Sequence, residues 1–270
     1  MGFAMATPNS IRPTFQPQSA ASAPAVRRLL AVALLALAGL GARPGVAKEP
    51  RFHVEIAPLA DGLYLVHSFG SYQGEKTEAN GLLVASGKCV AMVDTAWDVD
   101  QTREILAWVK ANLHQKVKFA VITHAHADRI GGIDALRSAN IPTFGDELTP
   151  PEARKNGFRS PDHLFRKQLA LACGDLTLDL FYPGPGHTRD NLAVYVRERK
   201  VLYGGCFLKS AASTSLGNIA EADLEAWPES LERLERKFPD AVTVIPGHGS
   251  LAPGSIEQTR KLLREKPPAH

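Results

Sequence analysis

Hydrophobic and polar positions along the chain form two batches of short strand-like segments, each followed by helical patterns. Alternating or short apolar runs between turn residues predict strands, and an apolar stripe at helical spacing predicts a helix. We expect strands at 52–58, 63–67, 81–85, 89–93, 117–123, 176–182, 192–196, 201–203 and 242–245. We expect helices at 98–113, 133–139, 223–238 and 253–264. This order, without a linker or a composition break, predicts one domain with an α/β sandwich fold.

Residues 1–47 do not follow these patterns. Arg27 and Arg28 precede an apolar run at 29–40, which ends in small residues up to Ala47. A basic start, a short apolar run and a small-residue end are typical of a secretory signal. A membrane anchor is the alternative, but a spanning helix needs about 20 apolar residues. We therefore expect a cleaved signal at 1–47 and a periplasmic domain at 48–270, with no stable membrane anchor.

Composition excludes some classes of function. Hydrophobic residues make up 44% of the 270 residues and charged residues 22%, which is enough for a packed core and excludes wholesale disorder. The net charge of +3 depends on the four arginines of 1–47. The remainder is nearly neutral, so a nucleic-acid partner has no electrostatic support. We expect a monomer.

The three cysteines, Cys89, Cys173 and Cys206, have no framework spacing, and we exclude a disulfide scaffold. An odd number leaves one thiol in an oxidising compartment, and a metal site would explain it.

The clearest chemical signal follows the expected buried strand at 117–123. His124 and His126 stand two residues apart, so on an extended chain both imidazoles face the same side. Asp128 continues the series, and the pair Gly131 and Gly132 lets the backbone turn into the next helix. Such residues can supply zinc with several ligands at about 2.0–2.3 Å.

Three further strand ends each supply one metal-type residue: His187, Cys206 and His248. Each follows a glycine, which allows close backbone approach. Because strand ends in such sheets share one edge, the six residues are expected to converge there.

With these motifs in place, the chain resembles the metallo-β-lactamases, in the di-zinc subclass with a three-histidine and an Asp-Cys-His site. The resemblance covers about residues 55 to 264. The motifs that carry it are His124-Ala125-His126-Ala127-Asp128-Arg129, Gly186-His187-Thr188, Gly205-Cys206, Lys209, Leu216-Gly217-Asn218 and Gly247-His248. Glyoxalase-type relatives carry histidine where Arg129 stands and aspartate where Cys206 stands, so these two positions favour the lactamases.

The resemblance implies an αββα sandwich with two Zn²⁺ ions per chain in a groove at one sheet edge. His124, His126 and His187 would hold one zinc, and Asp128, Cys206 and His248 would hold the other. A hydroxide formed at neutral pH would attack the lactam carbonyl, and Asp128 would also orient it. The implied function is hydrolysis of β-lactam antibiotics, which confers resistance.

Substrate-binding residues follow from their positions. Lys209 is expected to bind the carboxylate of a bicyclic β-lactam, and Asn218 its carbonyl oxygen or carboxylate. The segment 68–74 is interpreted as a hairpin loop whose Phe69 and Tyr72 cover the substrate, with Trp97 lining the groove.

Supporting roles are expected for three other residues. Asp94 would orient a ligand imidazole, Arg129 would lie near the thiolate, and Asp190 would be a turn residue. Two alternatives stay open: a di-zinc hydrolase of the same fold acting on a lactone, thioester or phosphoester, and a secreted zinc-binding protein without turnover.

Overall fold

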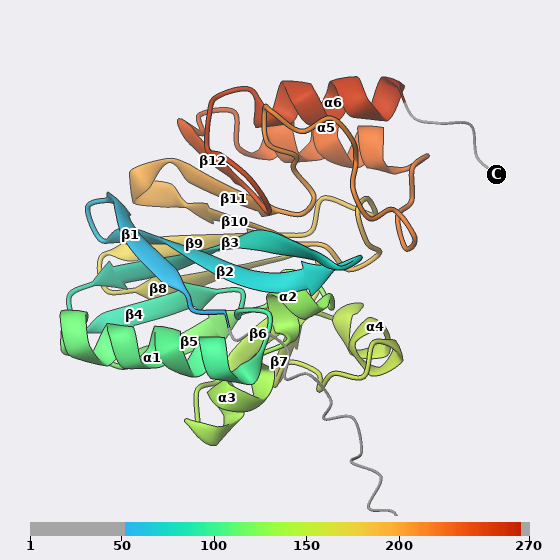
Figure 1. Cartoon of the computed structure of the whole chain (residues 1–270). Helices are drawn as coiled ribbons and strands as arrows, with labels where there is room; N and C mark the ends of the chain where they lie inside the picture. Colours follow the sequence, from blue (N-terminus) through green and yellow to red (C-terminus); the bar gives the residue numbers. More distant parts are fainter. Residues whose placement is uncertain (1–51, 266–270) are drawn as a thin grey trace, which may run out of the picture. The chain divides into compact units, whose positions relative to one another are not determined.

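The computed structural model describes residues 52–265. The expected signal at 1–47 lies outside the described residues. Two sheets pack face to face, and helices cover the outer face of each, which gives the four layers of the expected αββα sandwich (Figure 1). Within the described range, no helix is both long and apolar enough to cross a membrane.

The first sheet has seven strands, hydrogen-bonded in the same order as they occur in the chain. They are β1 Glu55–Ala60, β2 Leu63–Tyr72, β3 Glu75–Ser86, β4 Cys89–Val93, β5 Val117–Val121, β6 Thr143–Asp146 and β7 His163–Phe165. The pairs β1·β2, β2·β3 and β3·β4 are antiparallel, whereas β4, β5, β6 and β7 pair in parallel.

The second sheet has five strands in the order β12-β11-β10-β9-β8. Their bounds are β8 Gln168–Cys173, β9 Leu176–Phe181, β10 Ala193–Val196, β11 Val201–Gly205 and β12 Thr243–Pro246. Only the β11·β12 pair is parallel. Consequently β11 and β12 end at the same edge of this sheet.

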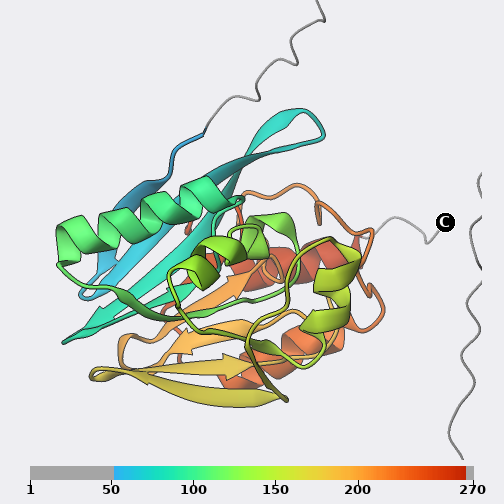
Figure 2. The ribbon, with the colours of Figure 1, turned by 90° about the horizontal axis from the view of Figure 1, so that it is seen from below.

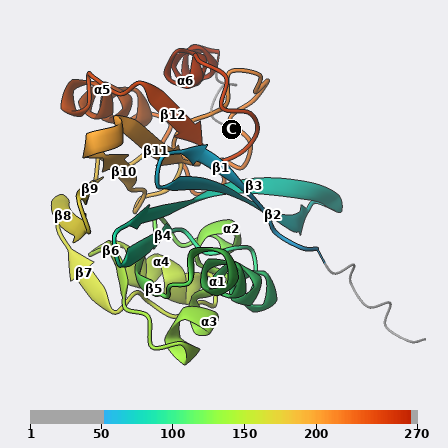
Figure 3. The ribbon, with the colours of Figure 1, turned by 90° about the vertical axis from the view of Figure 1, so that its left-hand side faces the viewer.

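Helices flank the sheets on both sides. They are α1 Val99–Leu113, α2 Ala127–Ile130, α3 Ile133–Ser138, α4 Thr149–Lys155, α5 Trp227–Lys237 and α6 Ser255–Arg264, with a short 3₁₀ turn, η1, at Arg197–Arg199. Figure 2 shows α1 and α3 over the first sheet, and Figure 3 shows α5 and α6 on the opposite side of the molecule.

Three apolar clusters hold these layers together. The largest lies between the sheets and joins side chains such as Leu82 and Val93 to Leu178 and Val194. A second cluster packs the second sheet against α5 and α6 around Trp227. The third packs the first sheet against α1 and α3. Burial of these faces supplies the main driving force for the fold.

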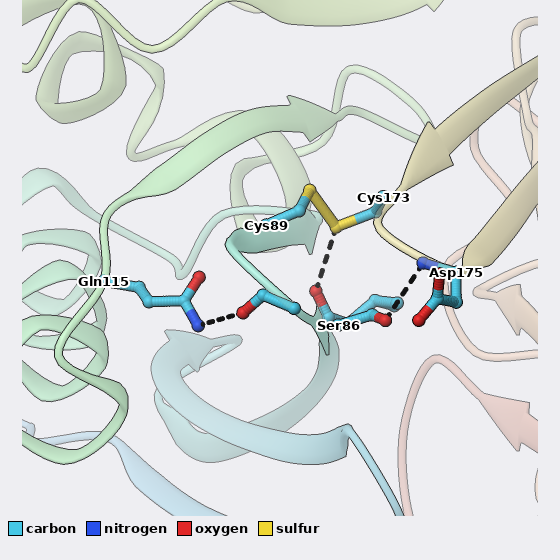
Figure 4. Close-up of a disulfide and its surroundings, with 7 residues drawn as sticks. Ser86, Cys89, Gln115, Cys173 and Asp175 are labelled. Carbon is cyan, nitrogen blue, oxygen red and sulfur yellow. Dashed lines mark hydrogen bonds between the residues drawn. A yellow bond between two sulfur atoms is a disulfide. The ribbon is translucent and has the colours of Figure 1, made fainter.

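A disulfide joins Cys89, the first residue of β4, to Cys173, the last residue of β8 (Figure 4). It links the two sheets across 84 residues of sequence. Beside it, the Asp175 N–H donates a hydrogen bond to Ser86 Oγ. The sequence analysis excluded only a disulfide scaffold and did not predict this single pair, because the pairing depends on the approach of two strands from different sheets. Cys206 is the free, buried thiol.

The hairpin between β2 and β3 also differs from expectation. β2 continues to Tyr72, so most of the expected loop at 68–74 is strand, and the turn is only Gln73-Gly74. Both turn residues have a positive φ, of 52° and 84°. At Gly70 a Cβ would lie 2.2 Å from the Trp97 ring, so the hairpin needs glycine there to lie over the indole.

Candidate metal centre

All six expected ligands lie at strand ends along one edge of the sandwich. His124 and His126 follow β5, and Asp128 lies in the short helix α2. His187 lies between β9 and β10, Cys206 directly follows β11, and His248 follows β12. The parallel pairing of β11 with β12 brings the last two together.

Three imidazole nitrogens converge at the first group. His126 Nδ1 lies 3.2 Å from His124 Nε2 and 3.2 Å from His187 Nε2. Nitrogens bound tetrahedrally to zinc at about 2.0–2.1 Å lie about 3.3–3.4 Å apart, so this spacing fits one zinc ion. Burial lowers the pKa of His124 and of His187 well below the usual value. Both rings therefore stay neutral, as metal ligation requires.

The second group brings together a thiol, a carboxylate and an imidazole. Cys206 Sγ lies 3.4 Å from Asp128 Oδ2 and 3.2 Å from His248 Nε2, and the last two atoms are 3.3 Å apart. Together with the first group, these atoms form two adjoining ligand sets of the kinds that zinc prefers. The donor chemistry and the spacing of both groups therefore fit zinc.

Electrostatics within the second group favour a cation. Burial raises the pKa of Asp128, but Arg129 and His248 outweigh burial and hold it well below its usual range. Burial lowers the pKa of His248, yet Cys206 and Asp128 raise it to about 10. The groups that favour a proton on His248 also favour a metal ion, so the two compete for the site.

Arg129 lies beneath this group and is fully buried. Its guanidinium donates to Cys206 Sγ at 3.0 Å and to the Gly247 carbonyl at 2.7 Å, and its Nε is 2.9 Å from Asp128 Oδ2. The expected place of Arg129 beside the thiol is confirmed. Gly247 has no room for a side chain, since a Cβ would lie 2.8 Å from the guanidinium.

Asp94 differs from expectation, because within residues 52–265 its carboxylate bonds to Thr123 and Tyr203 and to no ligand imidazole. Its carboxylate accepts hydrogen bonds from Thr123 N at 2.7 Å, Thr123 Oγ1 at 2.8 Å and Tyr203 Oη at 2.8 Å. Thr123 Oγ1 lies 3.3 Å from His124 Nδ1, so a threonine stands between the carboxylate and the ring. Burial raises the pKa of Asp94 to about 6, although Arg129 opposes this.

The remaining ring nitrogens have different partners. His248 Nδ1 donates to the Glu78 carbonyl at 2.5 Å, and His126 Nε2 lies 2.9 Å from Glu221 Oε2. For the buried His187 Nδ1, the described residues supply no hydrogen-bond partner. Burial raises the pKa of Glu221, but the contacts with Lys155 and His126 lower it overall, so the carboxylate is ionised at neutral pH.

Members of both metal-type groups line one cleft of about 650 Å³: His126 and His187 of the first, and Asp128, Cys206 and His248 of the second. Tyr72, Trp97, Lys209 and Asn218 line it as well, in agreement with their expected positions. Phe69 does not, because it is 8% exposed and its backbone N–H and C=O are bonded to the Gln101 side chain. The expectation for Phe69 was wrong, because its side chain is buried away from the cleft lining.

Two lining residues have fixed surroundings. Lys209 is 8% exposed, its backbone N–H donates to Thr259 Oγ1, and its Nζ lies 5.4 Å from the centroid of the Trp227 ring. Burial lowers the pKa of Lys209. Asn218 lines the cleft, and its Oδ1 accepts the Ala220 N–H at 3.1 Å.

Comparisons with known proteins agree with this geometry. The family model of the metallo-β-lactamase superfamily matches residues 76–248. The chain belongs to this superfamily. The metallo-β-lactamase type 2 of Bacillus cereus is 34% identical over 220 residues, which are 81% of this chain and 86% of that protein.

Solved structures of the superfamily show the same architecture. The metallo-β-lactamase from Pontibacter korlensis is 35% identical with a TM-score of 0.76, over 79% of this chain and 100% of that one. The metallo-β-lactamase FIM-1 from Pseudomonas aeruginosa, solved in a mono-zinc form, is 34% identical with a TM-score of 0.73, over 79% and 96%. The resemblance seen in the sequence motifs is therefore confirmed.

Two features of this superfamily member were missed by sequence reasoning. Glu221 lies 95 residues from His126, in a segment without periodic pattern. Asp190 is fully buried rather than an ordinary turn residue, and burial raises its pKa to about 7. The Thr149 and Thr188 hydroxyls are close enough to oppose this rise, but neither makes a well-aligned hydrogen bond to the Asp190 carboxylate.

Proposed function

We propose that this protein is a zinc-dependent β-lactamase that hydrolyses the amide bond of β-lactam antibiotics with two zinc ions bound. The observation that carries the proposal is the pair of complete ligand sets, three histidines and Asp-Cys-His, at the base of one cleft. The named relatives are metallo-β-lactamases, which supports the same activity here.

Each ligand set has a distinct role in this proposal. His124, His126 and His187 would hold one ion, and Asp128, Cys206 and His248 the other. Bound zinc lowers the pKa of a coordinated water to about 7 and polarises a carbonyl, so it supplies a nucleophile at neutral pH. Arg129 keeps Asp128 ionised and the thiol in place, which prepares the second set for a cation.

Substrate binding would rest on side chains at the cleft wall. Lys209 is the buried cation at the cleft, and a charge-assisted contact from it to a substrate carboxylate fits bicyclic β-lactams. The Nδ2 of Asn218 can donate to the substrate carbonyl or carboxylate. Tyr72 and Trp97 would provide apolar walls.

A chromogenic cephalosporin tests the activity directly. We expect hydrolysis that a chelator abolishes and added zinc restores, with little turnover of a thioester control. Thioester turnover without cephalosporin turnover would instead favour another hydrolase of the same fold. Zinc bound to the protein with neither turnover would favour a zinc-binding protein without catalysis.

Zinc content tests the number of sites. Elemental analysis after dialysis against micromolar zinc should give two ions per chain, and Cys206→Ser should weaken one site because the softer thiolate is lost. A value that stays at one per chain would contradict the two-zinc proposal.

The proposed compartment is the periplasm, after cleavage of a signal near residue 47. The Cys89–Cys173 disulfide supports this, because disulfides persist in oxidising compartments. N-terminal sequencing of protein from a periplasmic extract tests it, and intact residues 27–40 in membrane-bound protein would contradict it. We also propose a monomer, which light scattering in solution would check.

A further inference from the structure

One metal-type histidine has a charged partner that comes from a distant loop. Glu221 lies between α4 and the three-histidine group, with one carboxylate oxygen toward each. Its Oε2 is 2.9 Å from His126 Nε2, and its Oε1 accepts a hydrogen bond from Lys155 Nζ at 2.6 Å. The side chain of Glu221 is 20% exposed and that of Lys155 is 61% exposed.

The Glu221 contact determines the tautomer of His126. A carboxylate only accepts hydrogen bonds, so Nε2 must carry a proton, and in the neutral ring Nδ1 then carries the lone pair. Nδ1 is the atom that faces His124 and His187. Glu221 therefore holds the ring in the form and orientation that a metal ion at this group requires.

His126 needs such a partner more than the other two ligands. His124 and His187 are buried at 1% and 4% exposure, so the surrounding residues enclose their rings. The His126 side chain is 16% exposed. Of the charged groups described near the three rings, Glu221 is the one that bonds directly to a ring nitrogen of this group.

Glu221 also lies on the segment that carries Asn218. The Ala220 N–H is held by Asn218 Oδ1, and the Asp223 N–H donates to the Gly186 carbonyl beside His187. On the other side, Lys155 ends α4, and the next residue, Asn156, donates to the Ala125 carbonyl between the first two ligands. The same carboxylate therefore links α4, a metal ligand and the substrate-facing loop.

We propose that Glu221 is a positioning residue: it fixes the His126 ring for zinc and ties the Asn218 loop to the three-histidine site, with Lys155 orienting its carboxylate. The proposal rests on zinc binding at the proposed sites. It requires no contact between Glu221 and the substrate.

The test is a metal titration that separates the two sites. Apoprotein is titrated with zinc against a chromophoric chelator and, separately, with cobalt(II), whose thiolate charge-transfer band reports the Cys206 site alone. Removing an outer partner of a metal ligand typically weakens binding 10- to 100-fold. We expect Glu221→Ala to weaken the three-histidine site by about this factor and to leave the thiolate band unchanged.

Matched variants distinguish positioning from a general structural effect. Glu221→Gln keeps an acceptor and should restore affinity to within about threefold of wild type, whereas Glu221→Met, of similar length without that acceptor, should not. Lys155→Ala should change affinity only a few-fold, because exposed ion pairs contribute little. Glu225→Ala, an exposed glutamate on the same segment, is the control and should match wild type.

Kinetics gives a second readout. If the loop is tied through Glu221, the alanine variant saturated with zinc should show a raised KM for a cephalosporin. Unchanged affinity at the three-histidine site, or equal weakening of both sites, would overturn the proposal. If Glu221→Ala does not fold, the Gln and Met variants decide alone. Wild-type protein that binds two zinc ions without hydrolysing the cephalosporin would contradict the proposed function but not this inference.

Discussion

Removing the disulfide between the sheets should lower stability without affecting the metal centre. The change is Cys89→Ala with Cys173→Ala, which keeps Cys206 as the only thiol. Cys173 is fully buried, so alanine is preferable to serine, whose hydroxyl would need a partner. Cys89 begins β4, and the other end of that strand leads to Asp94, whose carboxylate is bonded to Thr123 beside His124.

The size of the effect follows from the length of chain that the bond closes. A crosslink across 84 residues removes unfolded-state entropy equivalent to about 4.5 kcal/mol at 25 °C. Crosslinks often deliver less than this model value, so we expect a loss of about 3–4.5 kcal/mol. In proteins of this size, Tm falls by about 2–4 °C for each kcal/mol of unfolding free energy that is lost, so Tm should fall by roughly 10 °C.

Urea unfolding with saturating zinc measures the free energy of unfolding of both proteins, since zinc then contributes equally to each. A phosphine reductant should bring wild type close to the variant and leave the variant unchanged. We expect kcat/KM for a cephalosporin to stay within about twofold of wild type. A loss below about 1 kcal/mol, or an effect of the reductant on the variant, would refute the entropic reasoning.

Three other changes test separate parts of the structure. Lys209→Ala should lower kcat/KM about 10- to 100-fold through a raised KM, because a charge-assisted contact is worth roughly 1.5–3 kcal/mol; a lower kcat at unchanged KM would contradict this role. Asp190→Asn should become increasingly stabilising from pH 4 to pH 8. The folded-state pKa of about 7 lies above the usual 3.8, so wild type loses stability as pH rises through this window. The difference in free energy of unfolding between the variant and wild type, measured by urea unfolding, should reach at most about 4 kcal/mol. If both proteins changed in stability equally with pH, the raised pKa of Asp190 would be refuted. Gly70→Ala should destabilise the hairpin by about 1–3 kcal/mol and raise KM, because a Cβ there would displace Trp97; unchanged thermal unfolding would count against this.

The metal ligands could be predicted from sequence because each lies within a few residues of the end of a strand. His124, Cys206 and His248 stand next to short apolar runs, so local pattern alone placed them at one edge. Their mutual distances then followed from the common edge of the sheets. The Arg129 position was likewise predictable, through the resemblance of its motif.

Residues whose role depends on distant contacts could not be placed in this way. Glu221 reaches His126 across 95 residues, and Cys89 reaches Cys173 across 84, with no local pattern at either end. The loop of the β2–β3 hairpin was predicted to be too long. Ser and Gly residues in 68–72 weaken the alternating pattern of a strand, but this segment pairs with β3 and is therefore strand. Strands β6, β7 and β8 were missed, although β8 alternates in burial along most of its length.

Helix α5 shows why element boundaries were less accurate than element existence. The apolar stripe predicted a helix from 223, but the helix begins at Trp227, with Pro228 in its first turn. Proline is favoured at the first helical positions because it has no N–H to satisfy. The preceding Asp223 instead accepts the Ala226 N–H, which makes residues 223–226 a turn.

Buried charged side chains are concentrated beneath the second metal-type group. Their pairing explains how the fold tolerates the energetic cost of burying them. Asp94 and Asp128 are both buried against Arg129, whose pKa is raised well above its usual value because these anions and Cys206 outweigh the effect of burial. An unpaired buried charge would destabilise the fold strongly, whereas a network with several hydrogen bonds offsets much of that penalty. Arg129 therefore serves stability and function at once: the contacts that make the buried carboxylates tolerable also hold Asp128 and Cys206 where a cation must bind.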